Sequence, residues 1–297
     1  MRQARIRIDD APCWYHCYNR VAGTRHDRPF GEVEKEQFAR LLKRVAQLYC
    51  VRVVAYQVLS NHFHLLLHAP DAEPDEQEIC RRYKNFHRGR RTLTPGSPAC
   101  RDWQARSRDI SWFMRHLQQL FTVWYNRSRP EPRRGSLWAD RFKHTLLEGG
   151  SAVWACWAYI ENNPVRAGIV KRAADYRFGS YGIWMQSGRH PFAEEVQAAA
   201  LPMFQETFGL RRLEDIRQAL GRTLAGKAEQ QAMATVVERR VRYWTQGLVI
   251  GSRLFVDDVR WRCRTVKPSR QCPTVCMDDL SMANLYCWRR LRPADTA

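Results

Sequence analysis

The sequence predicts an α+β protein in which helices cover an antiparallel sheet. Two observations support this fold class. Segments rich in β-forming residues occupy four stretches: 14–21, 51–59, 62–67 and 142–147. Segments with apolar residues at helical spacing occupy three others: 32–50, 110–126 and 151–163. In chain order they form a strand-helix-strand-strand-helix-strand-helix arrangement, which is typical of a split βαβ unit.

The first expected strand, residues 14–21, ends at the turn-forming pair Ala22-Gly23. A helix is expected over residues 32–50 because apolar side chains recur there every three or four positions. These side chains are Phe38, Leu41, Leu42, Val45, Leu48 and Tyr49.

A β-hairpin is expected next, with Ser60-Asn61 as the break between its strands. Side chains alternate across a strand, so His62 and His64 point to one face while Phe63 points into the core. Two imidazoles on one face can hold a metal ion. Taken alone, the pair also fits ordinary sheet residues.

Residues 71–109 form a polar, arginine-rich insertion that is expected to be mobile, with some helix near residues 76–86. The run Thr94-Pro95-Gly96-Ser97-Pro98 predicts a loop. A second helix follows over residues 110–126, with apolar residues on one side. They are Phe113, Leu117, Leu120, Phe121 and Trp124.

The last expected helix of the unit starts at Ser151, a plausible N-cap, and ends at Asn163, because a residue before proline resists helical dihedrals. Tyr159 and Asn163 are four residues apart and therefore share a helix face. A phenol and an amide placed this way can act as nucleophile and metal ligand. Taken alone, Tyr159 in this aromatic-rich helix fits a core residue, and Asn163 fits a helix end.

The chain divides into residues 1–190, which hold this unit, and residues 191–297, a basic and mainly helical extension expected to contact DNA. Helices are expected there over residues 213–224 and 229–244, and a turn over residues 250–253.

The charge balance indicates a polyanionic partner. The 49 Lys and Arg exceed the 30 Asp and Glu, which gives a formal charge of +19 over 297 residues. Arginine outnumbers lysine and 11 tryptophans are present, a mixture suited to phosphates and bases. Nucleic acid is therefore the leading partner class.

No apolar run is long enough to span a bilayer, and no signal segment opens the chain, so a cytoplasmic location is expected. Ten cysteines are scattered without an export signal and are expected to be reduced. The C-terminal set lacks the paired spacing of zinc knuckles, so a zinc site is not expected. The set consists of Cys263, Cys272, Cys276 and Cys287.

Over residues 12–185 the chain resembles the single-tyrosine HUH transposases, in particular the REP-associated tyrosine transposases of bacteria. Four segments carry the resemblance: 15–20, Tyr-His-Cys-Tyr-Asn-Arg; 61–66, Asn-His-Phe-His-Leu-Leu; 135–143, Gly-Ser-Leu-Trp-Ala-Asp-Arg-Phe-Lys; and 159–170, beginning Tyr-Ile-Glu-Asn-Asn-Pro-Val. The combination of a His-hydrophobe-His strand with a later Tyr-x-x-x-Asn-Pro-Val is specific, whereas either half alone is weak.

The resemblance implies a ferredoxin-like split βαβ core and an endonuclease that rejoins strands. His62, His64 and Asn163 would hold one Mg²⁺ or Mn²⁺, which polarises the scissile phosphate. Tyr159 would attack the phosphorus and leave a 5′-phosphotyrosine with a free 3′-hydroxyl. An unperturbed phenol has a pKa of about 10, so another group must help to remove its proton. The candidates are His16, His144, Lys143 and Glu161.

The implied substrate is single-stranded or hairpin DNA beside REP-like palindromes. Expected DNA contacts are phosphate contacts by Arg20, Arg141, Lys143 and Arg166 and base stacking by Trp138. If the helix phase is wrong, Glu148 or Glu161 replaces Asn163 as third metal ligand. A nucleoid-associated monomer is expected, with a dimer as the alternative.

Two other functions remain open at this point. The chain would be a domesticated hairpin-DNA-binding protein if it had lost cleavage. It would be a metal-dependent nuclease using water if Tyr159 were merely packed. Covalent trapping on DNA separates the tyrosine mechanism from both.

Overall fold

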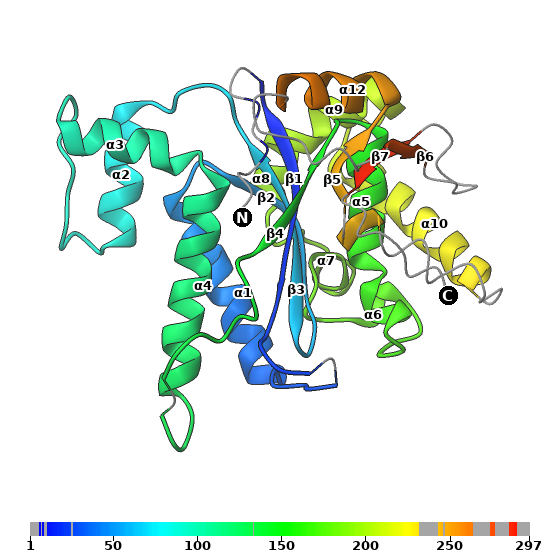
Figure 1. Cartoon of the computed structure of the whole chain (residues 1–297), viewed down its shortest axis with the longest axis horizontal. Helices are drawn as coiled ribbons and strands as arrows, with labels where there is room; N and C mark the ends of the chain where they lie inside the picture. The colour runs from blue at the N-terminus through cyan, green and yellow to red at the C-terminus, as the bar shows by residue number, and fades with distance from the viewer. Residues whose placement is uncertain are drawn as a thin grey trace.

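The computed structural model describes residues 6, 8, 11–24, 26–132, 134–231, 243–245, 247–263, 274–276 and 285–289. They form a mixed α+β structure around a seven-stranded sheet with strand order β2-β3-β1-β4-β5-β7-β6 (Figure 1). The predicted fold class, α+β, is confirmed at this level.

The first four strands match the expected segments closely. They are β1 (Cys13–Arg20), β2 (Arg52–Val58), β3 (His62–Ala69) and β4 (Lys143–Leu147). β3 pairs antiparallel with both β2 and β1, and β1 pairs antiparallel with β4. β3 therefore lies inside the sheet, with His64 opposite Tyr18 on one side and Gln57 on the other.

Two helices cover one face of this sheet, α1 (Glu32–Leu48) and α4 (Ile110–Arg127). Their apolar side chains pack with Phe63 and its neighbours on the strands, as the alternation along β3 predicts. The ring of Phe38 lies 4.7 Å from that of Phe63 and 5.2 Å from that of Phe121, measured between centroids. The histidines of β3 consequently face the other side of the sheet.

The insertion between β3 and α4 is more ordered than expected. α2 (Glu76–Phe86) lies where the sequence predicts a helix, and α3 (Pro98–Ser107) forms where a loop is expected. The Ser97 side chain accepts a hydrogen bond from the Cys100 amide, and Pro98 occupies the first turn. Serine followed by proline thus starts a helix here, since proline is tolerated at its first position.

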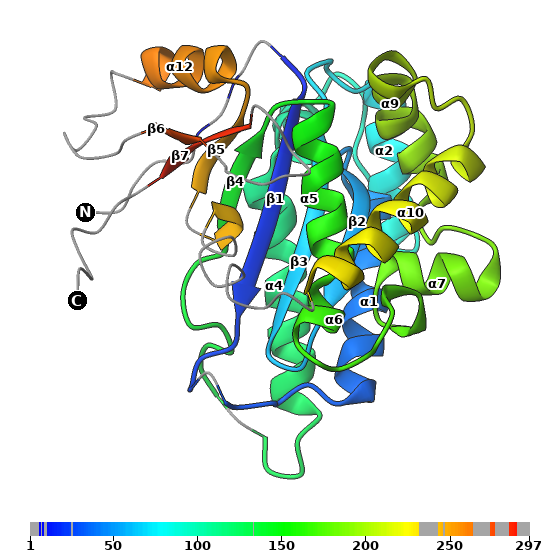
Figure 2. The same cartoon turned by 90° about the vertical axis from the view of Figure 1, so that its right-hand side faces the viewer.

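α5 (Ser151–Glu161) covers the histidine-bearing face of the sheet (Figure 2). Its N-cap is Gly150 with a φ of 63°, and not Ser151 as predicted, because the chain turns there through the left-handed region that favours glycine. After Asn162 the short α6 (Asn163–Arg166) takes Pro164 into its first turn. The helix therefore breaks at Asn162, just before the predicted end.

Further helices pack outside α5 and enclose it. They are η1 (Ala173–Asp175), α7 (Ser180–Ser187), α8 (Ala193–Glu195), η2 (Val196–Ala200), α9 (Leu201–Phe208) and α10 (Leu213–Gln231). Nearly all of α5 is consequently buried between this layer and the sheet.

The extension, expected to be mainly helical, contains three short strands besides its helices. β5 (Gly247–Gly251) pairs in parallel with β4, and β7 (Tyr286–Arg289) and β6 (Thr274–Cys276) complete the sheet. α12 (Arg253–Arg262) follows β5, with Ser252 as its N-cap where a turn is expected. The helix expected over residues 229–244 lies mostly outside the described residues.

Candidate active site

Four side chains from two adjacent strands form one polar face under α5. Because β1 and β3 are antiparallel and side chains alternate, His16 and Tyr18 lie on the same face as His62 and His64. The His62 and His64 ring centroids are 5.1 Å apart, and those of His16 and His64 are also 5.1 Å apart. The predicted pairing of the two β3 histidines on one face is thus present.

Each β3 histidine uses one ring nitrogen within the protein. His62 Nδ1 lies 2.7 Å from Asn61 Oδ1, and His64 Nδ1 lies 2.9 Å from His16 Nε2. Asn61 Oδ1 can only accept, so His62 carries its proton on Nδ1 and has its lone pair on Nε2. If His64 likewise donates to His16, both Nε2 atoms are free to bind a ligand. Such hydrogen bonds are what orient metal-ligating histidines.

The three histidines are uncharged at neutral pH. Burial lowers the pKa of His16 to about 3 and that of His62 to about 4, with Arg20 and Arg28 adding to the shift of His62. The pKa of His64 lies well below its usual value, mainly because of burial. Neutral imidazole is the form that coordinates metal ions.

Tyr159 projects from α5 onto this histidine cluster. Its ring centroid lies 5.7 Å from that of His64 and 5.8 Å from that of His16, both edge-on. The guanidinium of Arg166, on α6, lies over the same ring at 5.1 Å from its centroid. The structure therefore brings the predicted nucleophile next to the predicted metal ligands, together with a cation.

The pKa of Tyr159 is raised, and burial is the main cause. The charge of Arg166 and a hydrogen bond from it act in the opposite direction, as does a hydrogen bond from Asn163. The phenol is consequently protonated at neutral pH, and Arg166 is the neighbour that most favours its anion.

Asn163 is the first residue of α6, one residue after the end of α5. Its Nδ2 donates to the carbonyl oxygen of Tyr159 at 3.0 Å and to that of Ile160 at 3.3 Å. The amide therefore caps the end of α5 and holds the backbone of Tyr159, while its Oδ1 remains available as a ligand.

The indole of Trp244 covers Tyr159. The two rings are stacked with centroids 5.3 Å apart and an angle of 22° between their planes. The next residue, Thr245, accepts a hydrogen bond at its backbone oxygen from the Tyr18 hydroxyl. As a result, Tyr159 is only 6% exposed. Sequence analysis missed Trp244, and no local motif distinguishes it from the other tryptophans.

Of the other candidate bases and ligands, Lys143 lies opposite Tyr18 on the face of this cluster, whereas the rest are bound or packed elsewhere. Glu161 is buried and accepts hydrogen bonds from Trp157 and Ser180, and burial raises its pKa to about 7. Glu148 accepts from the amide and hydroxyl of Ser252. His144 packs against Tyr15 on the opposite face of the sheet. Only His16, among the proposed bases, contacts Tyr159.

The predicted DNA contacts are dispersed. Arg20 lies opposite His62 and donates to the Thr24 carbonyl oxygen, whereas Arg141, just before β4, and Lys143, its first residue, are exposed. Trp138 is only 8% exposed. Its ring packs against those of three phenylalanines, Phe30, Phe63 and Phe121. Base stacking by Trp138 stays a prediction, which this packing disfavours.

The donor set fits a weakly held divalent cation. Two neutral imidazoles and one amide oxygen supply at most three ligands, which leaves water and phosphate oxygens to complete a shell. Within the described ranges, no group of three His, Cys, Asp or Glu side chains is arranged to hold a metal. Of the four C-terminal cysteines, Cys272 lies outside those ranges.

Comparisons with known proteins give likeness to solved structures and no match of other kinds. No family model and no curated protein matches the chain. A solved structure of a REP-associated tyrosine transposase bound to a REP hairpin is similar over 65% of this chain and 89% of its own, at 18% identity and a TM-score of 0.42. A likeness this weak carries no argument about function, which therefore depends on the site itself.

None of the helices that the structure describes is long and apolar enough to cross a membrane.

Proposed function

We propose that the protein is a metal-dependent endonuclease and strand transferase of the HUH type that uses Tyr159 as its nucleophile. One observation carries the proposal: the ring of Tyr159 lies 5.7 Å from that of His64, on the face shared by His62. A tyrosine that only filled the core would not need two neutral, oriented imidazoles beside it.

The reaction follows from the groups present. The Tyr159 oxygen attacks the scissile phosphorus and the bond from phosphorus to the 3′ oxygen breaks, which leaves a 5′-phosphotyrosine and a 3′-hydroxyl. The phenol loses a proton and the departing 3′ oxygen gains one. Attack by a 3′-hydroxyl on the phosphotyrosine reverses these steps and rejoins a strand.

His62 and His64 would hold a Mg²⁺ or Mn²⁺ ion through their Nε2 atoms, with Asn163 Oδ1 as a third ligand. Bound there, the ion would supply Lewis acidity to the phosphate. Asn163 and Arg166 position the nucleophile, the former through the α5 backbone and the latter through its charge. His16 accepts the proton of His64 Nδ1 in this arrangement, so it positions His64 and does not act as the base for the phenol.

Single-stranded or hairpin DNA is the proposed substrate, because a buried tyrosine needs a flexible strand to reach it and the chain carries a net charge of +19. The antiparallel order β2-β3-β1-β4 supports a ferredoxin-like core. REP-like palindromes, a cytoplasmic, nucleoid-associated location and a monomeric state remain parts of the proposal that depend on the resemblance in sequence motifs.

Covalent trapping tests the proposal. Purified protein is incubated with labelled hairpin DNA and Mn²⁺, and SDS-resistant adducts are counted for wild type, Tyr159→Phe and Tyr18→Phe. Tyr18 is a matched control because its hydroxyl, on the same face, is bound to Thr245. Adducts should vanish in Tyr159→Phe alone. Cleavage that survives in Tyr159→Phe would indicate a nuclease using water, and binding without cleavage would indicate a domesticated binder.

A further inference from the structure

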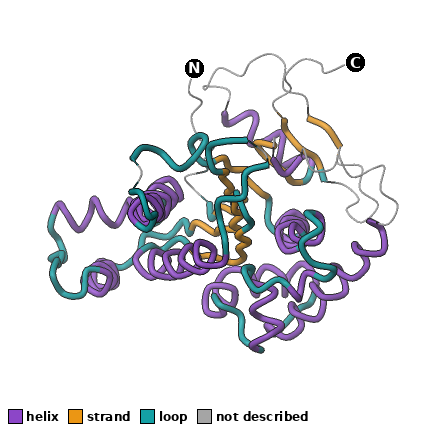
Figure 3. Tube along the Cα trace, turned by 90° about the horizontal axis from the view of Figure 1, so that it is seen from below, coloured by secondary structure: helices purple, strands orange, loops and turns teal. Residues whose placement is uncertain are grey.

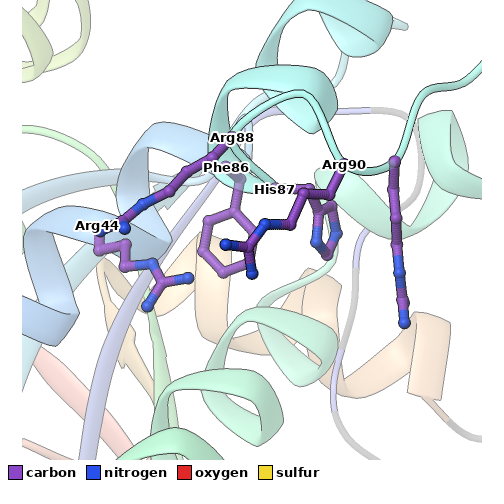
Figure 4. A pocket seen from close by; sticks show the side chains of 6 residues that line it. Arg44, Phe86, His87, Arg88 and Arg90 are labelled. Atoms are coloured by element: carbon purple, nitrogen blue, oxygen red, sulfur yellow. The ribbon is translucent and has the colours of Figure 1, made fainter.

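A strongly basic cavity lies at the end of α2, away from the candidate active site. It has a volume of about 480 Å³ and is lined by Arg44 from α1 and by residues that end and follow α2 (Figure 4). These are Phe86, His87, Arg88, Arg90 and Arg91. We call it the arginine pocket. It belongs to the α1 and α2 side of the sheet, whereas Tyr159 lies on the α5 side (Figures 1 and 3).

The four arginines of this pocket carry unbalanced charge. In the described part of the chain, none of their guanidinium groups lies within ion-pair distance of a carboxylate, and no acidic side chain lines the cavity. By contrast, Arg81 and Arg82, which lie on α2 itself, both form ion pairs with Glu78. Four close cations without anions repel each other, so the pocket is suited to an anionic ligand.

Aromatic packing holds one wall of the pocket. The Arg44 guanidinium lies 4.6 Å from the centroid of Phe86, and the rings of His87 and His116 each lie 5.2 Å from that of Phe86. Burial lowers the pKa of His87, and the charges of Arg91 and Arg44 lower it further, so His87 adds hydrogen-bonding capacity and no charge.

Arg88 occupies a backbone position that normally favours glycine. Its φ is 53°, and it is the single non-glycine residue with positive φ in the described ranges. The Arg88 amide binds the Asn85 carbonyl and the Gly89 amide binds the Lys84 carbonyl, the pattern that ends many helices. A side chain in this conformation costs about 1 kcal/mol relative to glycine. An arginine therefore stands at a strained backbone position, and its guanidinium lines the pocket.

Stabilisation of the α2 C-terminus explains part of this charge but not all of it. Cations favour the negative end of a helix dipole within its last turn. Arg44 comes from another helix, and glycine at position 88 would end α2 with less strain. Ligand binding accounts for both features.

We propose that the arginine pocket binds phosphodiester groups of a DNA strand, as a contact separate from the site of cleavage. This inference rests on the proposed function for its choice of DNA. Guanidinium groups bind phosphate oxygens bidentately, and a cavity of about 480 Å³ has room for a stretch of backbone rather than one small anion.

Binding at different salt concentrations tests the pocket without cleavage. The affinity for labelled hairpin DNA with a single-stranded extension is measured in EDTA for wild type, Arg88→Asn/Arg90→Gln and Arg172→Gln/Arg212→Gln. The last variant loses the same charge, but from arginines that are paired with Asp175 and Asp215. We expect several-fold weaker binding and a salt slope smaller by about 1.5 for the pocket variant only, since two phosphate contacts are lost.

Thermal unfolding separates binding from a structural role. Asparagine tolerates positive φ, so Arg88→Asn should melt at the same temperature as wild type or higher. A lower melting temperature with unchanged DNA affinity would overturn the proposal, as would equal losses in the pocket variant and its control. Inorganic phosphate could raise the melting temperature of wild type while the pocket variant binds DNA as tightly as wild type. That result would indicate a site for small anions and would also overturn the proposal. Adduct formation is measured in a separate experiment. If wild type binds DNA but forms no adduct, the result contradicts the proposed function and leaves the proposal for the arginine pocket intact.

Discussion

At the scale of single residues, the surroundings of Tyr159 oppose its ionisation. Burial raises its pKa, and Arg166 is the main group that opposes this effect. The phenolate is the attacking form, so the rate of adduct formation should rise with pH from neutral to above 10, where an unperturbed phenol titrates. Single-turnover rates across this range measure the effect.

Arg166→Gln should slow adduct formation at every pH below the phenol pKa, because loss of the cation raises that pKa further. Arg166→Lys keeps a charge and should retain part of the rate. Absorbance titration of Tyr159, by difference against Tyr159→Phe, would reveal whether the pKa moves as expected. An unchanged pH profile in Arg166→Gln would contradict this role.

His16 on β1 and His68 on β3 lie on the same face of the sheet but differ in their contacts. His16 Nε2 binds His64 Nδ1, whereas the His68 ring packs against Trp14 at 4.7 Å. Loss of a hydrogen bond that orients a metal ligand costs roughly 10- to 100-fold in metal affinity. We therefore expect weaker Mn²⁺ binding for His16→Gln and no such loss for His68→Gln. Equilibrium Mn²⁺ titration by electron paramagnetic resonance compares the two, and equal affinities would exclude this role of His16.

At the scale of elements, the start of α5 controls the position of Tyr159. Gly150 has a φ of 63°, and a Cβ there would lie 3.1 Å from the Thr207 hydroxyl oxygen and 3.2 Å from its methyl carbon. Gly150→Ala should therefore lower the free energy of unfolding by about 1 kcal/mol or more. Gly226 in α10 meets nothing within 4 Å, so Gly226→Ala should raise it by about 0.5–1 kcal/mol. Urea unfolding measures the change in the free energy of unfolding for both variants. A change of the same sign in both would contradict the special role of glycine at position 150.

Sequence patterns predicted the elements that have long, regular periodicity. The first four strands, α1, α2, α4 and α5 lie within a few residues of their expected bounds. α3 was missed because Ser97-Pro98 looks like a loop until its cap is formed. β6 and β7 are too short for periodicity to identify. β7 forms because β5 offers an edge to pair with, and β6 pairs in turn with β7.

The candidate site was predictable to the extent that it depends on strand alternation. His62 and His64 share a face because residues two apart on a strand always do, and the same rule applied to Tyr15-His16-Cys17-Tyr18 would have added His16 and Tyr18. Trp244 reaches Tyr159 through tertiary packing of a distant segment, which no local pattern encodes. For Trp138, tertiary packing against three phenylalanines is the observed contact, and the expected contact with DNA stays a prediction.

At the scale of the whole molecule, the segment that holds Trp244 closes the candidate site. We expect this indole to limit access of DNA to Tyr159, since the two rings are stacked and Tyr159 is nearly buried. Trp244→Ala should make Tyr159 react several-fold faster with tetranitromethane. Mass spectrometry of the nitrated peptide measures this rate, and circular dichroism checks that the variant is folded. An unchanged rate in a folded variant would show that other groups cover Tyr159.

The proposed cleavage mechanism depends on a covalent bond between Tyr159 and a 5′-phosphate. The most direct measurement is mass spectrometry of the SDS-resistant adduct after digestion with trypsin and nuclease, with hairpin DNA labelled on either side of the cleavage site. We expect a nucleotide phosphate attached to the peptide that contains Tyr159, and this nucleotide should carry the label from the 3′ side of the break. A modification on another residue, or a label from the 5′ side, would contradict this mechanism.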